Sequence, residues 1–153
     1  MNAVGIIAEY NPFHNGHLYH LQKVKELYPN SLIILVLNGY FLERGEVSII
    51  SKKNKTNIAL LEGIDIVIEL PFVYGTQSAD VFANASITML EKIGCEYVVF
   101  GSECNNLDVL HKITDYTIDN SIEYNEKVKK YLDEGLNYPT ALAKAINIEF
   151  TFN

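Results

Sequence analysis

Three of the chain's four histidines lie in one short stretch, EYNPFHNGHLYHL, at positions 9–21. Apolar residues recur at helical spacing after Gly16, which predicts that a helix begins there. The free N–H groups at the start of a helix form a ready site for an anion such as phosphate. His14 and His17 are three residues apart, so both rings can face that site and donate N–H groups to phosphate oxygens. The stretch therefore predicts a nucleotide-phosphate site.

Other interpretations of the same histidines stay open. A lone histidine is usually structural or simply exposed, and this is the better interpretation for His20, one turn inside the helix. A metal site made of His14, His17 and His20 is possible by count, but no carboxylates lie nearby with ligand spacing. Gly16 either lets the backbone approach a ligand or lets the helix begin without a Cβ in the way.

The rest of the chain alternates short apolar runs with amphipathic segments. Strands are predicted at 3–8, 32–37, 64–70 and 96–100, and helices at 16–28, 52–62 and 79–93. The tail reads as helical: Asn120 and Glu123 have capping-box spacing before a helix closed by Gly135, and Pro139 suits the first turn of a last helix.

This alternation predicts an α/β fold, a Rossmann-like doubly wound parallel sheet covered by helices on both faces. Such sheets bind ligands beyond the carboxyl ends of their strands, near the point where the strand order reverses. The histidine stretch follows the first predicted strand, so it lies at the default site. Pro12 disfavours helical geometry at Asn11 and predicts an extended loop there.

Composition sets further bounds. The 153 residues are one domain's worth, with no apolar run near the ~20 residues that span a bilayer, so no membrane partner is expected. The N-terminus does not read as a signal peptide, and Cys95 and Cys104 match no zinc spacing, which favours reduced thiols in the cytoplasm. The net charge of −7 makes the chain a poor stand-alone nucleic-acid binder.

The stretch NGYFLERGEVSIISKKNK, at positions 38–55, is the second informative one because it follows the second predicted strand. Arg44 lies between acidic neighbours and suits either a surface ion pair or a substrate contact. Lys52, Lys53 and Lys55 fall in the first turn of a helix, where cations are electrostatically disfavoured, so an anionic partner is one explanation. Asp80 falls in the first turn of another helix, where a carboxylate is favoured in any case.

His14-Asn-Gly-His17 after the first strand resembles the signature of the adenylyl-transferring superfamily. That superfamily includes class I aminoacyl-tRNA synthetases and the pantetheine-phosphate and nicotinamide-nucleotide adenylyltransferases. Together, GIIAEYNPFHNGHLYH, FLERGE, DIVIELP, QSADVFA and FGSE resemble the bacterial tRNA(Met) cytidine acetate ligase family. The resemblance implies a HIGH-motif nucleotidyltransferase that activates acetate with ATP. The acetyl group would then pass to N4 of the wobble cytidine of elongator tRNA(Met).

The resemblance also implies site residues. An ATP loop would comprise Ile7, Ala8, Glu9, Tyr10, Asn11, Pro12, Phe13, His14, Asn15, Gly16, His17, Leu18, Tyr19 and His20, with Gly101 against the adenosine. The catalytic set would be His14, His17 and Arg44. The substrate or RNA side would comprise Gly39, Arg44, Glu46, Lys52, Lys55 and Asp80. Mg²⁺ is expected only with the ATP phosphates, with no protein ligand assigned.

The chain departs from that family in two places. After RGE the family usually has a proline and later an aromatic residue and an arginine, whereas this chain has Val47-Ser48-Ile49 and then Lys53-Asn54-Lys55. The family also continues well beyond this length, so residues 1–153 are expected to be a single adenylating domain, an N-terminal fragment without the tRNA-binding part. A small-molecule adenylyltransferase and a non-catalytic ATP-binding module are the alternative functions.

Overall fold

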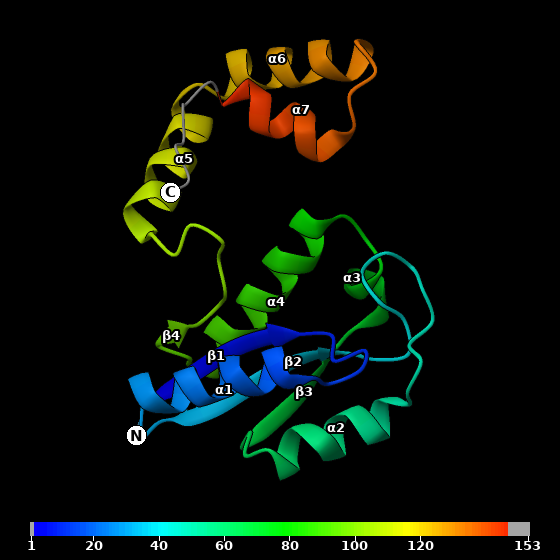
Figure 1. The fold of residues 1–153 in the computed structure, drawn as a ribbon, viewed down its shortest axis with the longest axis vertical. Helices are drawn as coiled ribbons and strands as arrows, with labels where there is room; N and C mark the ends of the chain where they lie inside the picture. The colour runs from blue at the N-terminus through cyan, green and yellow to red at the C-terminus, as the bar shows by residue number, and fades with distance from the viewer. Residues whose placement is uncertain (1, 147–153) are drawn as a thin grey trace. The chain divides into compact units, whose positions relative to one another are not determined.

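The computed structural model describes residues 2–146, and its contacts divide the chain into two compact units, Met1–Gly101 and Ser102–Asn153. Figure 1 shows the first unit as the part that contains the sheet and the second as helices. The sequence predicts one domain over the whole chain, because no linker of biased composition separates the two units. The strand–helix alternation that defines the fold belongs to the first unit.

The first unit is built on a four-stranded sheet in which every pairing is parallel. The strands are β1 (Ala3–Ala8), β2 (Leu32–Asn38), β3 (Ile66–Leu70) and β4 (Tyr97–Val98), in the order β3-β2-β1-β4. The predicted parallel sheet is confirmed, although β4 has two residues where the sequence predicts five. The chain moves outward from β1 to β2 and β3 and then returns to the other side of β1, so the strand order reverses between β1 and β4.

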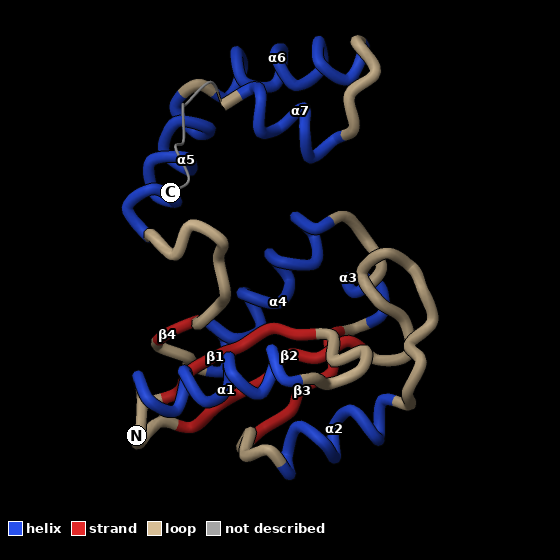
Figure 2. Tube along the Cα trace, viewed as in Figure 1, coloured by secondary structure: helices blue, strands red, loops and turns tan. Residues whose placement is uncertain are grey.

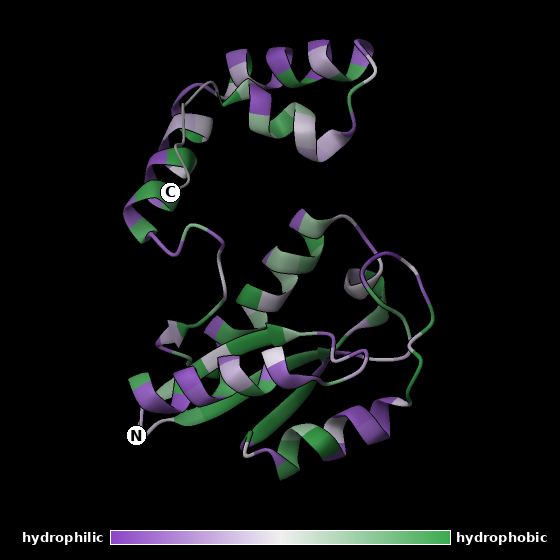
Figure 3. Cartoon of the chain, in the orientation of Figure 1, coloured by the Kyte–Doolittle hydropathy of each residue, from purple (hydrophilic) through white to green (hydrophobic). Residues whose placement is uncertain are grey.

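Helices cover both faces of this sheet, as a doubly wound fold requires. Leu21 and Val24 of α1 (Asn15–Leu27) and Ala59 of α2 (Lys52–Leu61) share one core cluster with Val4 and Leu35 of the sheet. Leu90 of α4 (Ala79–Ile93) packs on the opposite face with β2 residues Ile34 and Val36, and α3 (Phe72–Gly75) is a single short turn. The strands are among the most hydrophobic segments of the unit (Figure 3), as expected for a parallel sheet that helices cover on both faces.

Local signals place the helix ends where the sequence predicts them. Ser78 caps α4 by accepting a hydrogen bond from the Val81 amide at 3.5 Å, and Gly94 ends it in the left-handed region at φ 91°. Close packing fixes the position of α4 on the sheet, since a Cβ on Gly5 would come within 2.6 Å of the Leu90 side chain.

The second unit is helical and has a small core of its own. Its helices are α5 (Leu107–Asp119), α6 (Ser121–Asp133) and α7 (Tyr138–Ala145), shown in blue in Figure 2. Gly135 at φ 87° after α6 and Pro139 in the first turn of α7 are as predicted. The predicted capping box is wrong, because the Asn120 side chain instead donates to the Tyr116 carbonyl at 2.9 Å. Within residues 2–146, no helix is long and apolar enough to span a membrane.

Candidate functional site

The two histidines of the HNGH stretch form the N-terminal cap of α1. His14 Nδ1 accepts a hydrogen bond from the Gly16 amide at 3.0 Å, and His17 Nδ1 accepts one from the His14 amide at 3.2 Å. This is the geometry of a capping box, with imidazoles in place of the usual hydroxyl and carboxamide. The two rings stack with their centroids 3.8 Å apart.

This arrangement fixes the donors that the two rings offer. Because each Nδ1 accepts a backbone N–H, the ring proton of each imidazole lies on Nε2. Burial, and then the charges that His14 and His20 would carry, lowers the pKa of His17 to about 4, so this ring is neutral near pH 7. The cap therefore leaves two Nε2–H donors beside the positive end of α1, which suits phosphate oxygens.

The ring of Tyr10 packs against the ring of His17. Its ring lies 4.8 Å from that of Phe13, nearly perpendicular, and 4.7 Å from that of His17, and it is only 2% exposed. Burial raises the pKa of Tyr10 to about 12. The backbone of Tyr10 lies in the left-handed region at φ 47°, an uncommon conformation for a tyrosine.

The segment between β1 and α1 differs from the prediction at one point. Asn11 and Pro12 form a tight turn with a cis peptide bond, whereas the sequence predicts an extended loop. The preference of a pre-proline residue for non-helical geometry does not distinguish between these two outcomes.

Gly16 is needed for the shape of the cap. A Cβ at this position would lie 2.9 Å from His14 Cε1, so any side chain would push the ring out of place. Of the two roles considered for this glycine, the contacts support the second, a helix start without an obstructing Cβ.

His20 and Tyr19 have different surroundings. His20 Nε2 is buried and has no hydrogen-bond partner within residues 2–146. Burial lowers the pKa of His20, and a hydrogen bond with the Val99 backbone opposes that shift. Tyr19 is exposed, with the Lys23 ammonium 5.6 Å from its ring centroid. His20 therefore faces the β4 side of the sheet, whereas Tyr19 faces solvent.

Gly101 follows β4, on the other side of the point where the strand order reverses. Within residues 2–146, and apart from its chain neighbours, no atom lies within 4 Å of the position that a Cβ would take. No contact among these residues therefore requires a glycine here.

The sequence profile of one family, described as HIGH Nucleotidyl Transferase, matches residues 1–152. The chain belongs to the HIGH nucleotidyl transferase family. The resemblance based on HNGH and FLERGE is also confirmed by curated relatives named tRNA(Met) cytidine acetate ligase. One from Fusobacterium nucleatum is 50% identical over 145 residues, covering 95% of this chain and 36% of that protein. One from Caldicellulosiruptor bescii is 42% identical over 159 residues, covering 100% of this chain and 40% of that protein.

A solved structure supports the same assignment. Thermotoga maritima TmcAL bound with alpha-thio ATP superposes with a TM-score of 0.84 at 39% identity, over 95% of this chain and 36% of that one. The Rossmann-like fold is thereby confirmed. The chain spans only 36–40% of the length of these three proteins.

In this HIGH nucleotidyl transferase chain, side-chain hydrogen bonds join the segment between β1 and α1 to the second stretch. Glu9 Oε1 accepts hydrogen bonds from Asn38 Nδ2 at 2.8 Å and from the Glu43 amide at 2.7 Å. Asn11 Oδ1 accepts from Ser48 Oγ at 3.0 Å and from the Ile49 amide at 2.8 Å. The long loop between β2 and α2, visible in Figure 2, is therefore held at several points to the turn that precedes α1.

Arg44 lies at the tip of this loop. The tip is a turn closed by the hydrogen bond from the Leu42 amide to the Glu46 carbonyl at 2.8 Å, and Arg44 and Glu46 are both exposed. Within the described part of the chain Arg44 forms no ion pair, so its guanidinium is available to a ligand. The amide of the neighbouring Glu43 donates a hydrogen bond to Glu9 Oε1, and this bond holds the tip of the loop beside the end of β1.

The lysines of the second stretch have different surroundings. Lys52 pairs with both carboxylate oxygens of Glu69, at 2.8 and 3.0 Å, and a methyl group on Gly39 would clash with that carboxylate. Lys55 is fully buried, and its Nζ has no hydrogen-bond partner within residues 2–146. Burial lowers the pKa of Lys55, against the opposing effect of the Glu9 and Glu69 charges.

Asp80 lies in the first turn of α4, on the face of the sheet opposite to α1 and α2, and it is exposed. The described residues contain no group of three His, Cys, Asp or Glu side chains arranged for a metal ion.

Sequence reasoning missed two residues of this region. Asn38 is 2% exposed and also bonds the Phe41 and Gly75 carbonyls, at 3.3 and 3.4 Å, so it joins three segments. The available signal was a polar residue directly after the apolar run 32–37. Glu69, inside the predicted strand 64–70, was equally visible as the one charged residue near its carboxyl end.

Proposed function

We propose that this chain is the adenylating part of a tRNA(Met) cytidine acetate ligase. The observation that carries the proposal is the stacked pair of His14 and His17, whose Nδ1 atoms cap α1 at the carboxyl end of β1 and whose Nε2–H groups can donate to a ligand. Attack of a carboxylate on the α-phosphorus of ATP needs no protein nucleophile, only positioned phosphates and donors for the developing charge. His14 and His17 would supply such donors, His17 as a ring that burial keeps neutral, and together with Arg44 at the loop tip they form the proposed catalytic set.

The proposed reaction has two steps. Acetate attacks the α-phosphorus, the bond to the β-phosphate oxygen breaks, and acetyl-adenylate and pyrophosphate form. The cytidine N4 amine then attacks the acetyl carbonyl, AMP leaves, and the amine loses one proton. Mg²⁺ would arrive with the ATP phosphates rather than on protein ligands. A tRNA substrate implies that the reaction takes place in the cytoplasm.

The remaining residue assignments follow from this proposal. The ATP loop of residues 7–20 would hold the triphosphate, with Gly101 against the adenosine. Lys52, Lys55, Gly39 and Glu46 would belong to the acceptor side, while Asp80 is the weakest member because it lies on the opposite face. The names of the relatives do not favour a small-molecule adenylyltransferase.

The first test is ATP binding by calorimetry with variants that keep the cap. His14→Asn and His17→Gln retain side-chain acceptors for the Gly16 and His14 amides but remove the imidazole Nε2–H groups. A hydrogen bond to a charged oxygen is worth about 1.5–3 kcal/mol, so each variant should weaken ATP binding about 10- to 100-fold. Unchanged affinity in both variants would contradict the proposed phosphate contacts.

The second test is acetate dependence. The chain, and a chimera in which it replaces the matching region of the Thermotoga maritima relative, are assayed for incorporation of labelled pyrophosphate into ATP. Exchange should require acetate in the chimera, and labelled acetate should then appear in tRNA. Exchange without acetate would favour another acceptor, and ATP binding without exchange in an otherwise active host would favour a non-catalytic module.

A further inference from the structure

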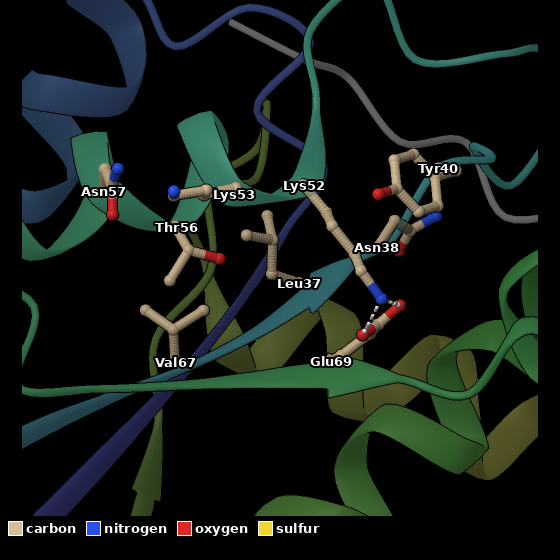
Figure 4. Close-up of a pocket in the computed structure, with 9 residues that line it drawn as sticks. All are labelled: Leu37, Asn38, Tyr40, Lys52, Lys53, Thr56, Asn57, Val67 and Glu69. Atoms are coloured by element: carbon tan, nitrogen blue, oxygen red, sulfur yellow. Dashed lines mark hydrogen bonds and ion pairs between the residues drawn. The ribbon is translucent and has the colours of Figure 1, made fainter.

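A pocket of about 350 Å³ opens between α2 and the carboxyl ends of β2 and β3. Figure 4 shows its wall, which consists of Leu37, Asn38, Tyr40, Lys52, Lys53, Thr56, Asn57, Val67 and Glu69. None of the sequence motifs points to it as a unit, because its wall comes from two strands, a loop and a helix.

The wall combines an apolar base with a fixed aromatic ring. Leu37 and Val67 supply the apolar surface. The Lys52 ammonium lies 5.2 Å from the centroid of the Tyr40 ring and is held there by Glu69, as the dashed lines in Figure 4 show. Tyr40 is 54% exposed, so one side of its ring remains open to a planar partner. This is the composition of a stacking site for a base.

Charge and volume together define the class of molecule that the pocket can hold. The Lys52 charge is matched by Glu69 at 2.8 Å, which leaves Lys53 as the exposed lysine of the wall without an ion pair among the described residues. The volume also exceeds that of a molecule the size of acetate several-fold. An aromatic ring with a single phosphate fits both the volume and the charge.

Asn38 gives the pocket an unused acceptor. Its Nδ2 is committed to Glu9 and two carbonyls, whereas its Oδ1 is buried without a hydrogen-bond partner within residues 2–146. An orphaned buried oxygen of this kind calls for a donor. Asn38 belongs to the wall of the pocket, and Tyr40 lies next to it in Figure 4.

The pocket adjoins the proposed ATP loop. Ala8, the last residue of β1, is paired with Leu37 of β2, so the strand that leads to His14 ends beside the strand that leads into the pocket. The Glu9–Asn38 hydrogen bond of 2.8 Å spans this boundary.

We propose that this pocket binds the acceptor base of the RNA, a cytosine that stacks on Tyr40. In this arrangement the exocyclic amine donates to Asn38 Oδ1, and the nucleotide's phosphate lies near Lys53. The inference rests on the proposed function and adds the position of the second substrate. It also explains why the loop bearing Tyr40 is fixed to the ATP loop, because the amine must meet an activated acetyl group held there.

The test is NMR titration of the isotope-labelled chain with cytidine 5′-monophosphate, uridine 5′-monophosphate and, separately, ATP. Cytidine monophosphate should shift the amides of Tyr40, Lys53 and Asn57. Uridine monophosphate should bind about tenfold more weakly, because its O4 places an acceptor against Asn38 Oδ1. Shifts confined to other surfaces, or equal affinity for the two nucleotides, would overturn the proposal.

Variants separate stacking from charge. Tyr40→Ala should raise the Kd for cytidine monophosphate about tenfold or more, whereas Tyr138→Ala, at the same 54% exposure in the second unit, should leave it unchanged. Lys53→Ala should weaken cytidine monophosphate but not cytidine. If the chain binds ATP but not cytidine monophosphate, this inference is overturned and the proposed function is left intact. If the chain binds cytidine monophosphate but not ATP, the proposed function is contradicted and this inference is left intact.

Discussion

His17 is the residue whose protonation state matters most for the proposed site. Its folded-state pKa of about 4 lies below the usual histidine value of ~6.5, so the unfolded chain takes up a proton first as the pH falls. The stabilisation by neutral His17 is therefore complete above about pH 6.5 and is lost between about pH 6.5 and pH 4. A shift of this size corresponds to about 3 kcal/mol, and solvent screening of this partly exposed ring reduces the expected drop in the free energy of unfolding to about 2 kcal/mol.

Urea denaturation at a series of pH values measures this drop, and His17→Gln isolates it. Glutamine at this position still accepts the His14 amide but does not titrate. The variant should therefore lose distinctly less stability in acid than the original chain. Identical acid sensitivity in both proteins would mean that His17 is not held neutral by its surroundings.

Gly16 and Gly101 are two glycines that should respond differently to the same change. Gly16→Ala places a methyl group 2.9 Å from His14 Cε1 and displaces the ring, so ATP affinity should fall at least about tenfold. The better helix propensity of alanine, worth up to about 1 kcal/mol, opposes the clash in the free energy of unfolding. Calorimetry and denaturation on the same samples separate the two effects.

Gly101→Ala adds a methyl group that meets no atom within 4 Å among residues 2–146, apart from the chain neighbours, and it should leave stability unchanged. Its ATP affinity should nevertheless fall, because a methyl group would occupy the surface assigned to the adenosine. A variant that binds ATP normally would remove Gly101 from the nucleotide site.

Between elements, the Glu9 carboxylate is the main connection from β1 to the end of β2 and to the long loop that follows. Glu9→Ala would leave Asn38 Nδ2 and the Glu43 amide without this acceptor, which should cost about 2–3 kcal/mol of stability. Hydrogen exchange at the Glu43 amide should become faster, while the amides of β1 remain protected.

Two further substitutions check this interpretation. Glu9→Gln keeps an acceptor oxygen and should recover most of the stability. Glu46→Ala, in the same loop, removes an exposed carboxylate without a hydrogen bond among the described residues and should change neither quantity. Equal losses in Glu9→Ala and Glu46→Ala would show that the loop is not held through Glu9.

These connections also show where sequence reasoning reaches its limit. Strands and helix ends follow from local signals, such as the apolar run 32–37, Ser78 before α4 and Gly94 after it. The Glu9–Asn38 hydrogen bond joins residues 29 positions apart, and it appears only when the register of β1 against β2 is known. Lys55 of α2 illustrates the same limit, because helical periodicity alone does not reveal that its side chain is buried.

The proposed site shows a similar division. The sequence predicts that His14 and His17 face the helix start, and the hydrogen bonds add what it does not contain, namely which ring nitrogen is occupied. The pocket beside α2 was invisible in the sequence, since its nine wall residues come from four separate segments. A residue's partners across the sheet are set by tertiary packing, not by its own neighbours in the chain.

Charge and length over the entire chain bear on RNA binding. The net charge is −7, with 12 basic against 19 acidic residues, and phosphate neutralisation drives most nucleic-acid affinity. The Fusobacterium nucleatum and Thermotoga maritima relatives are about two and a half times this length, so we expect the surface that binds the body of the tRNA to lie in the part of those proteins that this chain does not match. We therefore expect the chain to bind an acceptor nucleotide but not to bind the rest of the tRNA tightly.

A comparison of tRNA binding by two proteins tests this expectation. The chain should bind tRNA no more than about tenfold more tightly than it binds cytidine monophosphate, since only a single base and few phosphates contribute. The full-length Thermotoga maritima relative should bind tRNA far more tightly, with an affinity that falls steeply as salt rises. Filter binding at several salt concentrations measures both slopes. Tight, salt-sensitive tRNA binding by the chain alone would mean that its exposed lysines, Lys53 among them, form a backbone-binding surface despite the overall negative charge.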